Sequence, residues 1–509
     1  MINIIPKPYV LKDFNARIYR QGFKIVCPQE LEEGLEIFKD EFSNYLAGNY
    51  VIEVKKKKFN NLEAYKIMID KKQIIIEAGN PRSLFYATRS LKQLINEKND
   101  KLIISCCEIF DKPKFSYRSF SLDDVRHFAG VEEVKKIIDI LSLLKIRYLH
   151  WHLSDDQGFR VNFKKFPKLY EVGSKRLKTI ILHDLSDTYD ETPYQYCYEE
   201  EEILDIIEYA KKHFISVIPE FDTPGHTASM VASYPYLHCL NQQIKVYEKT
   251  AWNADILCPS KETTYEFLDS FYEEVMCLFK DCEYIHLGGD EVIPSNWEIC
   301  PDCQNKMHEL GITDPARLQD YFSNRLIKLV RKYNKKLIMW ADGIKDDMPE
   351  DIILQYWTWR MEADSIERIN AGRPTIYSPC SQDYFDAPYV ELPLKTTYGR
   401  GIVLDGLTKQ GRANIIGMEC NMWREFIREN KLMEFMMFPR IHAFSESCWT
   451  HRKNQDYIDF KRRLKYHNKI LDQYNMVYAK EHLFDRADPE AKISYIYRHT
   501  DRYIEFNKN

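Results

Sequence analysis

The sequence lacks an uninterrupted apolar run long enough to cross a membrane. A membrane-spanning helix needs about 20 apolar residues in succession, whereas the apolar stretch at 137–144 is interrupted by Asp139 and Ser142. The first residues, MINIIPKPYVLKDF, also lack the basic segment, apolar core and small-residue cleavage site of a secretory signal. We therefore expect no membrane association and no export by the usual route, and the expected location is the cytoplasm.

The sequence also lacks a large excess of positive charge. Lys and Arg together number 72 and Asp and Glu 77, which gives a formal net charge of −5 at pH 7. Because a clustered basic excess is the electrostatic footprint of nucleic-acid binding, we expect no nucleic-acid partner. No pattern in the sequence assigns an oligomeric state.

Cysteine is present without the regular spacing of a disulfide framework. The 13 cysteines are an odd number scattered along the chain, which is typical of a reducing compartment where thiols serve as small buried hydrophobes. One local pair, Cys300 and Cys303 in CPDC, is followed by His308. A structural zinc site needs four ligands and no second pair follows at the usual interval, so we expect no metal and no cofactor.

The 509-residue chain is too long for one ordinary domain. Residues 1–112 alternate short strand-like runs with a segment, 83–98, whose apolar residues recur at helical spacing. This pattern predicts a small α+β accessory domain, and the charged, Pro-containing stretch DKPKF links it to the rest of the chain. We assign residues 113–475 to a second domain and 476–509 to a C-terminal extension.

The second domain repeats a short apolar strand, a turn and an amphipathic helix. Strand candidates lie at 117–122, 147–153, 216–221, 284–287, 336–340, 352–356, 375–377 and 414–419. Helical patterns lie at 131–144, 199–214, 263–279, 315–333 and 456–474. Eight such units predict an α/β fold, a (β/α)8 TIM barrel preceded by the small α+β domain.

Polar and aromatic residues follow almost every one of these strands. The segments are DDVRHF, HWHLSDDQGF, PEFDTPGH, GGDE, WADG, YW and ECNMWRE. In a (β/α)8 barrel the functional site is built from the loops at the carboxyl ends of the strands. The recurrence of acids, His and Trp at these ends predicts one polar pocket with aromatic walls.

Two adjacent acids, Asp290 and Glu291, end the run EYIHLGGDEV. Gly288 and Gly289 before them leave room for a ligand to approach the backbone. Two carboxyl groups with different surroundings can hold different protonation states. Cleavage of a glycosidic bond needs a proton donor together with a group that stabilises or captures an oxocarbenium-like centre. The spacing alone leaves open which mechanism applies.

Four motifs, HWHLSDDQGFR, IPEFDTPGH, HLGGDE and MWRE, occur in an order that resembles the β-N-acetylhexosaminidases of glycoside hydrolase family 20. The likeness begins in IIIEAGNPRSLFYATRSLKQLI and extends to about residue 450. The resemblance implies that 113–475 is a catalytic domain. It also implies exo-acting, retaining hydrolysis of terminal non-reducing N-acetyl-D-hexosamine through an oxazolinium intermediate, with the 2-acetamido oxygen of the substrate as nucleophile. The implied partners are oligosaccharides that end in N-acetylglucosamine or N-acetylgalactosamine.

The resemblance also implies a role for each catalytic residue. Glu291 would protonate the glycosidic oxygen and later act as base toward water, which requires an environment that keeps it protonated at first. Asp290 would remain charged, orient the acetamido N–H and stabilise the intermediate. Asp155 and His226 would orient Glu291, and Asp156 could share that task.

The remaining matched positions are implied to bind the sugar. Arg118 resembles the arginine that holds hydroxyls, although Ser119 follows it where the family usually has Gly. Tyr384 and Asp386 match a Tyr-x-Asp pair for the acetamido carbonyl and a hydroxyl, and Glu425 resembles the acid that holds the 4- and 6-hydroxyls. Three tryptophans resemble the walls around the acetamido methyl and the sugar ring: Trp340, Trp357 and Trp423.

Three alternatives stay open on the sequence. The first is an inactive N-acetylhexosamine-binding relative, against which the presence of both Asp290 and Glu291 argues. The second is an ordinary retaining glycosidase with a carboxylate nucleophile. The third is a zinc hydrolase that uses the Cys300 and Cys303 region.

Overall fold

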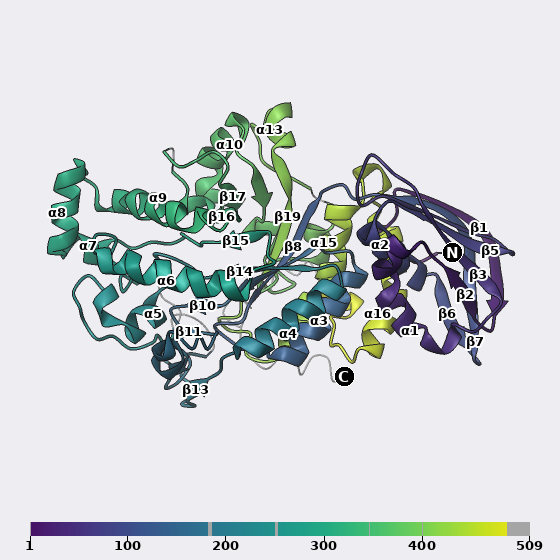
Figure 1. The fold of residues 1–509 in the computed structure, drawn as a ribbon, viewed down its shortest axis with the longest axis horizontal. Coiled ribbons are helices and arrows are strands. Elements are labelled where there is room, and N and C mark those ends of the chain that lie inside the picture. Colours follow the sequence, from purple (N-terminus) through teal and green to yellow (C-terminus); the bar gives the residue numbers. More distant parts are fainter. Residues whose placement is uncertain (1, 182–185, 250–252, 346, 400, 486–509) are drawn as a thin grey trace.

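The computed structural model describes residues 2–181, 186–249, 253–345, 347–399 and 401–485. The N-terminal domain lies at one end of an elongated molecule and a larger barrel domain at the other (Figure 1). Among the described residues, no helix combines the length and the apolar character that crossing a bilayer requires.

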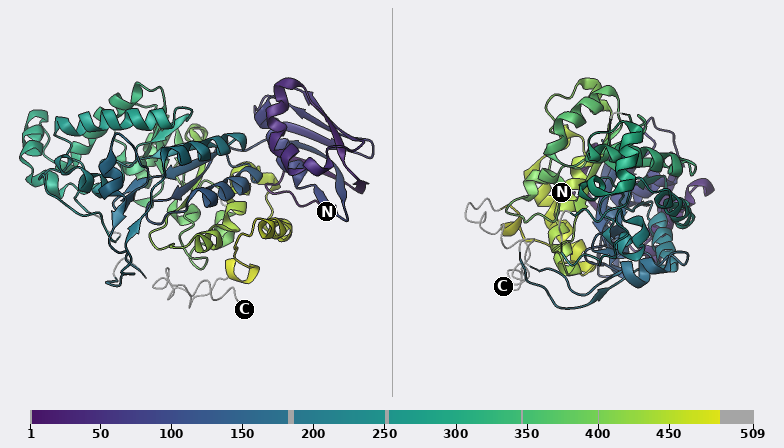
Figure 2. Two further views of the ribbon diagram at one scale, coloured as in Figure 1. Left: turned by 60° about the horizontal axis from the view of Figure 1, so that its bottom comes forward. Right: turned by 90° about the vertical axis from the view of Figure 1, so that its left-hand side faces the viewer.

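The N-terminal domain is a mixed sheet covered by helices on one face (Figure 2). In the described chain its strand order is β1-β7-β4-β5-β3-β2, with β6 paired to β7. The strands are β1 (Val10–Arg20), β2 (Phe23–Val26), β3 (Tyr50–Lys56), β4 (Tyr65–Ile69), β5 (Gln73–Ala78), β6 (Ile95–Lys98) and β7 (Lys101–Asp111). The helices are α1 (Glu36–Glu41) and α2 (Pro81–Lys92).

Helix α2 is shorter than the sequence pattern predicts. It begins with a capping box in which the Asn80 side chain accepts from the Ser83 backbone N–H and the Ser83 hydroxyl accepts from the Asn80 N–H. It ends at Lys92, because residues 95–98 form strand β6 along β7 instead of a last helical turn. The α+β character of the segment is confirmed.

Eight parallel strands close a barrel in the described part of the chain, which confirms the predicted fold. They are β8 (Tyr117–Asp123), β9 (Tyr148–His152), β14 (Ser216–Glu220), β15 (Tyr284–His286), β16 (Lys336–Trp340), β17 (Ile353–Tyr356), β18 (Thr375–Tyr377) and β19 (Ile415–Met422). Each predicted strand lies within three residues of the observed one at either end. The carboxyl ends of all eight strands therefore meet at one face of the barrel.

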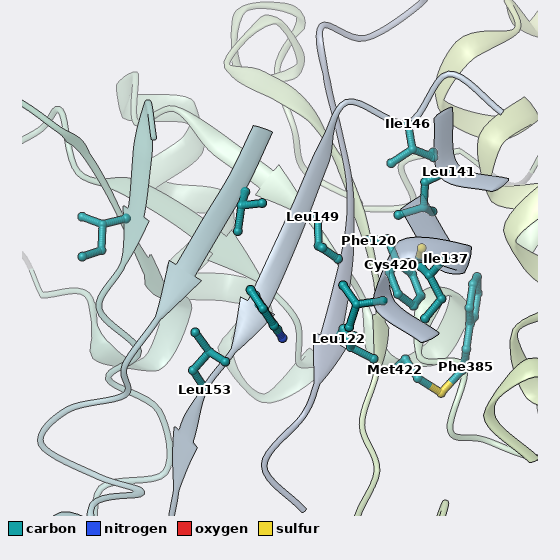
Figure 3. Packing of buried hydrophobic residues seen from close by; sticks show 14 of the residues in the cluster. Phe120, Leu122, Ile137, Leu141, Ile146, Leu149, Leu153, Phe385, Cys420 and Met422 are labelled. Atoms are coloured by element: carbon teal, nitrogen blue, oxygen red, sulfur yellow. The ribbon is translucent and has the colours of Figure 1, made fainter. Parts of the chain in front are cut away.

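The long helices of the barrel domain are α3 (Val131–Leu143), α4 (Glu200–Lys212), α6 (Glu262–Leu278), α9 (Leu318–Arg331), α10 (Glu362–Ala371), α15 (Arg440–Trp449) and α16 (Tyr457–Gln473). Their buried apolar residues belong to the same cluster as those of the strands. Figure 3 shows Ile137 and Leu141 of α3 close to Phe120 of β8 and Cys420 of β19. Strand residues that alternate with these point to the barrel interior.

Short elements lie in the loops between the long ones. They are β10 (Ser154–Asp155), β11 (Gly158–Phe159), β12 (Lys175–Arg176), β13 (Tyr194–Gln195), α5 (Ala228–Ser233), α7 (Ser295–Ile299), α8 (Pro301–Leu310), α11 (Cys380–Asp383), α12 (Leu394–Thr397), α13 (Lys409–Ala413), α14 (Asn430–Met437) and α17 (Glu481–Phe484). Met476 and Phe484 are buried against the barrel core, so the described part of the extension predicted at 476–509 packs on the barrel domain.

The barrel interior is layered from an apolar floor to a polar upper half. The floor is one buried cluster with a residue from each of seven strands: Tyr117, Tyr148, Ile218, Tyr284, Ile338, Ile353 and Ile376. Because side chains alternate along a strand, the next inward positions stand two residues further on. Six of these positions hold buried polar side chains: Ser119, His150, Glu220, His286, Gln355 and Ser378. The floor thus closes one end of the barrel, and polar groups rise toward the other.

Arg118 lies at the closed end of the barrel, so its predicted role in sugar binding is wrong. It is the second residue of β8 and is fully buried. Its guanidinium nitrogens contact the two Glu63 oxygens at 3.0 and 3.1 Å and the Tyr86 hydroxyl at 3.1 Å. It also lies 4.9 Å from the Trp449 ring. Arg118 therefore joins the barrel to the N-terminal domain, at the opposite end of β8 from the loops.

We expect Arg118→Ala to destabilise the protein by about 3–5 kcal/mol, because it leaves the buried Glu63 carboxylate without its cation. The measurement is urea unfolding of the variant and the parent protein. Lys66→Ala, which breaks the partly exposed pair with Glu108, serves as control and should cost about 1 kcal/mol or less. An Arg118→Ala protein with the stability of the parent and weakened sugar binding would contradict this placement.

Candidate active site

The four predicted catalytic side chains meet at the carboxyl ends of neighbouring strands. Asp290 and Glu291 follow β15, His226 follows β14, and Asp155 ends β10. His226 Nε2 lies 3.6 Å from Glu291 Oε2 and 3.8 Å from Asp290 Oδ2. On its other side, His226 Nδ1 lies 3.1 Å from Asp155 Oδ1 and 3.5 Å from Asp156 Oδ2. One imidazole thus connects two pairs of carboxyl groups, and Asp156 lies where the sequence suggested.

The backbone after β15 is turned sharply to present the two acids. Gly288 and Gly289 have φ values of +69° and +102°, a region that side chains other than glycine rarely adopt. A Cβ on Gly288 would lie 1.7 Å from Asp222 Oδ1. Glu291 itself has φ +51°, and its N–H donates to Asp342 Oδ2 at 2.9 Å. The backbone is strained at this position, and the contacts around it hold the strained conformation that orients the Glu291 side chain.

His226 and Asp155 form a charged pair. Burial opposes protonation of His226, but the Asp155 carboxylate, with Asp156 and Glu291, holds the pKa of this imidazole well above its usual value. Burial would raise the pKa of Asp155, but Arg126 and then His226 hold it well below the usual range. The pairing with Asp155 keeps the His226 imidazole protonated, and this positive charge lies close to both Asp290 and Glu291.

Asp290 departs from the expectation that it stays ionised in the free protein. Burial and then the neighbouring Asp222 raise the pKa of Asp290 well above its usual value. Burial likewise raises the pKa of Asp222 to about 8. Both carboxyl groups are therefore favoured in the protonated form, because burial and the closeness of two like charges oppose ionisation. Asp290 Oδ1 is buried without a hydrogen-bond partner among the described residues, so this oxygen is available to a ligand.

Four aromatic side chains form a box beside the acids. The ring centroids of Trp340 and Trp423 are 6.0 Å apart, and those of Tyr384 and Trp423 are 6.2 Å apart. Trp357 stacks on Tyr384 at 6.4 Å with an interplanar angle of 15°. Burial raises the pKa of Tyr384 well above its usual value, so its hydroxyl stays protonated and able to donate. The predicted aromatic walls are brought together.

Two of the tryptophans are fixed through their indole nitrogens. Trp340 Nε1 donates to Glu220 Oε1 at 2.8 Å, and Trp357 Nε1 donates to Asp342 Oδ1 at 2.9 Å. Asp342 also receives the Glu291 N–H on its other oxygen. A single carboxyl group therefore positions both one wall of the box and the backbone of Glu291.

Arg126 occupies the place at the site that the sequence analysis gave to Arg118. It belongs to the segment DDVRHF that leaves β8, and its Nη2 lies 2.7 Å from Asp155 Oδ2 and 3.8 Å from Glu425 Oε1. Its guanidinium lies 5.4 Å from the Trp423 ring. The signal that could have found it is its position at the carboxyl end of the strand.

Asp386 and Glu425 lie at the same end of the site as Arg126. Burial raises the pKa of Glu425 to about 7, although Arg126 lowers it, and Asp123 and Asp386 raise it further. Two acids and an arginine in partly buried positions offer acceptors and donors for several hydroxyl groups. The structure thus brings together all the predicted site residues except Arg118.

A buried network under the site was missed by the sequence analysis. Glu220 Oε1 contacts His286 Nδ1 at 2.9 Å, and Glu220 Oε2 contacts His150 Nε2 at 3.2 Å. His152 joins the same carboxylate to Asp155, whose Oδ2 lies 2.8 Å from His152 Nε2. The alternation His150–Trp151–His152 in the predicted strand was the available signal, since it places both imidazoles on the inner face.

These features together define a class: a barrel protein with a carboxyl pair and an aromatic box at the carboxyl ends of its strands, as in glycoside hydrolases. The family model described as "Glycosyl hydrolase family 20, catalytic domain" matches residues 115–452, and that described as "Glycosyl hydrolase family 20, domain 2" matches residues 1–112. The chain belongs to glycoside hydrolase family 20.

Known relatives agree with this assignment. The chain is 30% identical over 513 residues to a β-hexosaminidase of Porphyromonas gingivalis and 31% identical over 399 residues to one of Vibrio furnissii. The matches cover 94% and 75% of this chain. The chain spans 64% and 65% of the length of these two relatives.

A solved structure shares the architecture. The exo-β-N-acetylglucosaminidase of Vibrio harveyi in complex with N-acetylglucosamine superposes with a TM-score of 0.83 at 28% identity. The superposition covers 94% of this chain and 78% of that chain. Both domains are therefore included in the likeness.

We expect folding stability to fall as the pH rises through the range in which Glu425 titrates. The pKa of Glu425 is about 7 in the folded protein and about 4.3 in an unfolded chain. Between these values the folded state holds a proton that the unfolded state has released, so raising the pH favours unfolding. Glu425→Gln should reduce the fall in Tm between about pH 5 and pH 7.5, measured by thermal unfolding.

The exposed Glu429 provides a matched control. Glu429→Gln removes a carboxyl group four residues away and should leave the pH dependence of Tm as in the parent. A Glu425→Gln protein with the same pH dependence as the parent would contradict the assignment of this titration to Glu425.

Proposed function

We propose that the protein is an exo-acting β-N-acetylhexosaminidase that removes terminal non-reducing N-acetyl-D-hexosamine with retention of configuration. The observation that carries the proposal is the adjacency of Asp290 and Glu291, both within 4 Å of His226 Nε2, beside the box of Trp340, Trp357, Tyr384 and Trp423. The names of the relatives, and the N-acetylglucosamine bound in the Vibrio harveyi structure, support it.

The first step of the proposed mechanism places the 2-acetamido group in the aromatic box. The indoles surround the methyl group, and Tyr384, kept protonated by burial, donates to the acetamido carbonyl. Asp290 Oδ1, which lacks a partner among the described side chains and backbone, accepts the acetamido N–H. This bond and the positive charge that develops nearby oppose burial and favour ionised Asp290. Asp290 therefore releases its proton to the solvent when the substrate binds, and it is ionised in the complex.

The bond changes then occur at the anomeric carbon. Glu291 gives its proton to the glycosidic oxygen as the bond from C1 to that oxygen breaks, and the acetamido oxygen forms a bond to C1. Ionised Asp290 stabilises the resulting oxazolinium cation. In the second step the Glu291 carboxylate takes a proton from water, whose oxygen attacks C1 and releases the acetamido oxygen. Two displacements at C1 give retention.

Arg126, Asp386 and Glu425 bind the hydroxyl groups of the terminal sugar. The Arg126 guanidinium is held by Asp123 at 3.2 Å and by Asp155 at 2.7 Å, so its fork is oriented before the substrate arrives. We propose oligosaccharides ending in N-acetylglucosamine or N-acetylgalactosamine as substrates.

A pair of chromogenic substrates tests the proposal. We expect an aryl N-acetyl-β-D-glucosaminide to be hydrolysed at least about 1,000-fold more efficiently, in kcat/KM, than the aryl β-D-glucoside, which lacks the nucleophile. Comparable rates would favour the glycosidase with a carboxylate nucleophile. Binding of N-acetylglucosamine without hydrolysis of either substrate would favour the inactive relative.

Substitution of each acid separates the two roles. Glu291→Gln should lower kcat by about 10²–10⁴-fold for a poor leaving group and by less for an aryl group with an acidic phenol. Asp290→Asn should lower kcat by about 10²–10³-fold for both leaving groups, because it removes charge stabilisation. Steady-state kinetics provide the measurement, with Glu273→Gln on the exposed surface of α6 as control. Near-parent activity in either variant would refute the role given to that residue.

A further inference from the structure

Four cysteines converge at the end of the barrel domain farthest from the N-terminal domain, where α7 and α8 lie (Figure 1). They are Cys239, Cys258, Cys300 and Cys303, and their four Sγ atoms all lie within 4.8 Å of one another. All four are buried. They are contributed by two separate loops, the one after β14 and the one after β15.

The sulfur distances fit a tetrahedral metal centre. Cys303 Sγ lies 3.8 Å from Cys239 Sγ and 3.7 Å from Cys258 Sγ. Four sulfurs placed about 2.3 Å from a zinc ion at the corners of a tetrahedron are about 3.8 Å apart. A disulfide would bring two sulfurs to about 2.05 Å, and all four cysteines are free thiols.

The local backbone favours thiolates at two of the four positions. Cys300 is the N-cap of α8 and Cys303 lies in its first turn, where the helix dipole favours negative charge. Four thiolates in one buried place repel each other unless a cation joins them.

The cluster is enclosed by apolar side chains. Its neighbours are Ile256, Trp297, Met307 and Leu318, with Val292 and Ile312 at the edge. A site closed on all sides, with four protein ligands and no position left for water or substrate, is typical of structural rather than catalytic zinc.

We propose that Cys239, Cys258, Cys300 and Cys303 bind one Zn²⁺ ion in a closed structural site. Binding replaces the remaining thiol protons, which pass to the solvent, and forms four zinc–sulfur bonds. This departs from our expectation of no metal, which rested on the lack of a second pair after Cys303. The second pair precedes it, and its members are separated by 18 residues in the sequence.

The ion would fasten the loops that carry His226 and Glu291. Only three residues, 292–294, separate Glu291 from α7, and Cys300 directly follows that helix. On the other loop, the Leu257 N–H donates to Pro224 O and to Thr227 Oγ1, on either side of His226. Trp297 Nε1 also donates to Leu257 O at 3.1 Å. The site is distinct from the catalytic residues but holds their loops in register.

Metal analysis of the full chain tests the proposal without relying on catalysis. Protein purified under reducing conditions without chelator should contain about one zinc per chain by plasma mass spectrometry. A mercurial thiol reagent should release it to a colorimetric indicator. Cys258→Ser and Cys303→Ser should lose at least about 90% of the metal. Cys277→Ser, at an exposed cysteine outside the cluster, should retain it.

Cobalt substitution of the unmutated protein tests for tetrahedral sulfur coordination even if the serine variants fail to fold. Protein reconstituted with Co²⁺ should show the intense visible d–d and thiolate charge-transfer bands of tetrahedral sulfur coordination. Zinc at background level both as purified and after reduction and reconstitution would overturn the proposal. Thiol titration of the unfolded protein that shows disulfides among these four cysteines would overturn it as well.

Discussion

The buried Glu220 carboxylate holds the upper half of the barrel together. A charge at this depth is tolerated only if it is fully hydrogen-bonded and paired. Burial would raise the pKa of Glu220, yet the imidazoles around it, first His286 and His152, hold it well below its usual value. The barrel therefore encloses its charges in pairs, and the catalytic loops are built on top of that arrangement.

From Glu220 the pairing continues upward in alternating signs. His152 joins Glu220 to Asp155, Asp155 pairs with Arg126 and His226, and His226 lies between the two catalytic acids. A second branch leads from Glu220 through His150 to Glu419, whose Oε1 lies 2.9 Å from His150 Nδ1. Since each charge is oriented by the next, we expect substitutions along this chain of contacts to be energetically coupled. Such networks are best apportioned by double-mutant cycles.

The barrel was predictable from the sequence because each strand is a short buried run bounded by turns and followed by an amphipathic helix. Motifs at strand ends also predicted the catalytic acids, the histidine beside them and the aromatic walls.

Arg118 was misplaced because a local motif does not say which end of a strand a residue occupies. The structure places Arg118 at the floor of the barrel and Arg126 at its mouth. Residues 95–98 were misread as helix because pairing with β7 outweighs local pattern. The cysteine cluster and the raised pKa values of Asp222 and Asp290 depend on tertiary proximity, which sequence spacing does not encode.

The contacts of β8 and of the turn after α3 bear on how this protein can be dissected. Lys145 Nζ, fully buried, binds the Tyr65 hydroxyl, the Ser90 hydroxyl and the Asp111 carboxylate, all in the N-terminal domain. Together with Arg118 it leaves two cations in the barrel whose partners belong to another domain. A barrel excised at residue 113 would expose both and lose their counterions. The N-terminal domain therefore neutralises two buried cations at the floor of the barrel. A replacement of this domain by that of a homologue would have to keep the two acids that pair with them, Glu63 and Asp111.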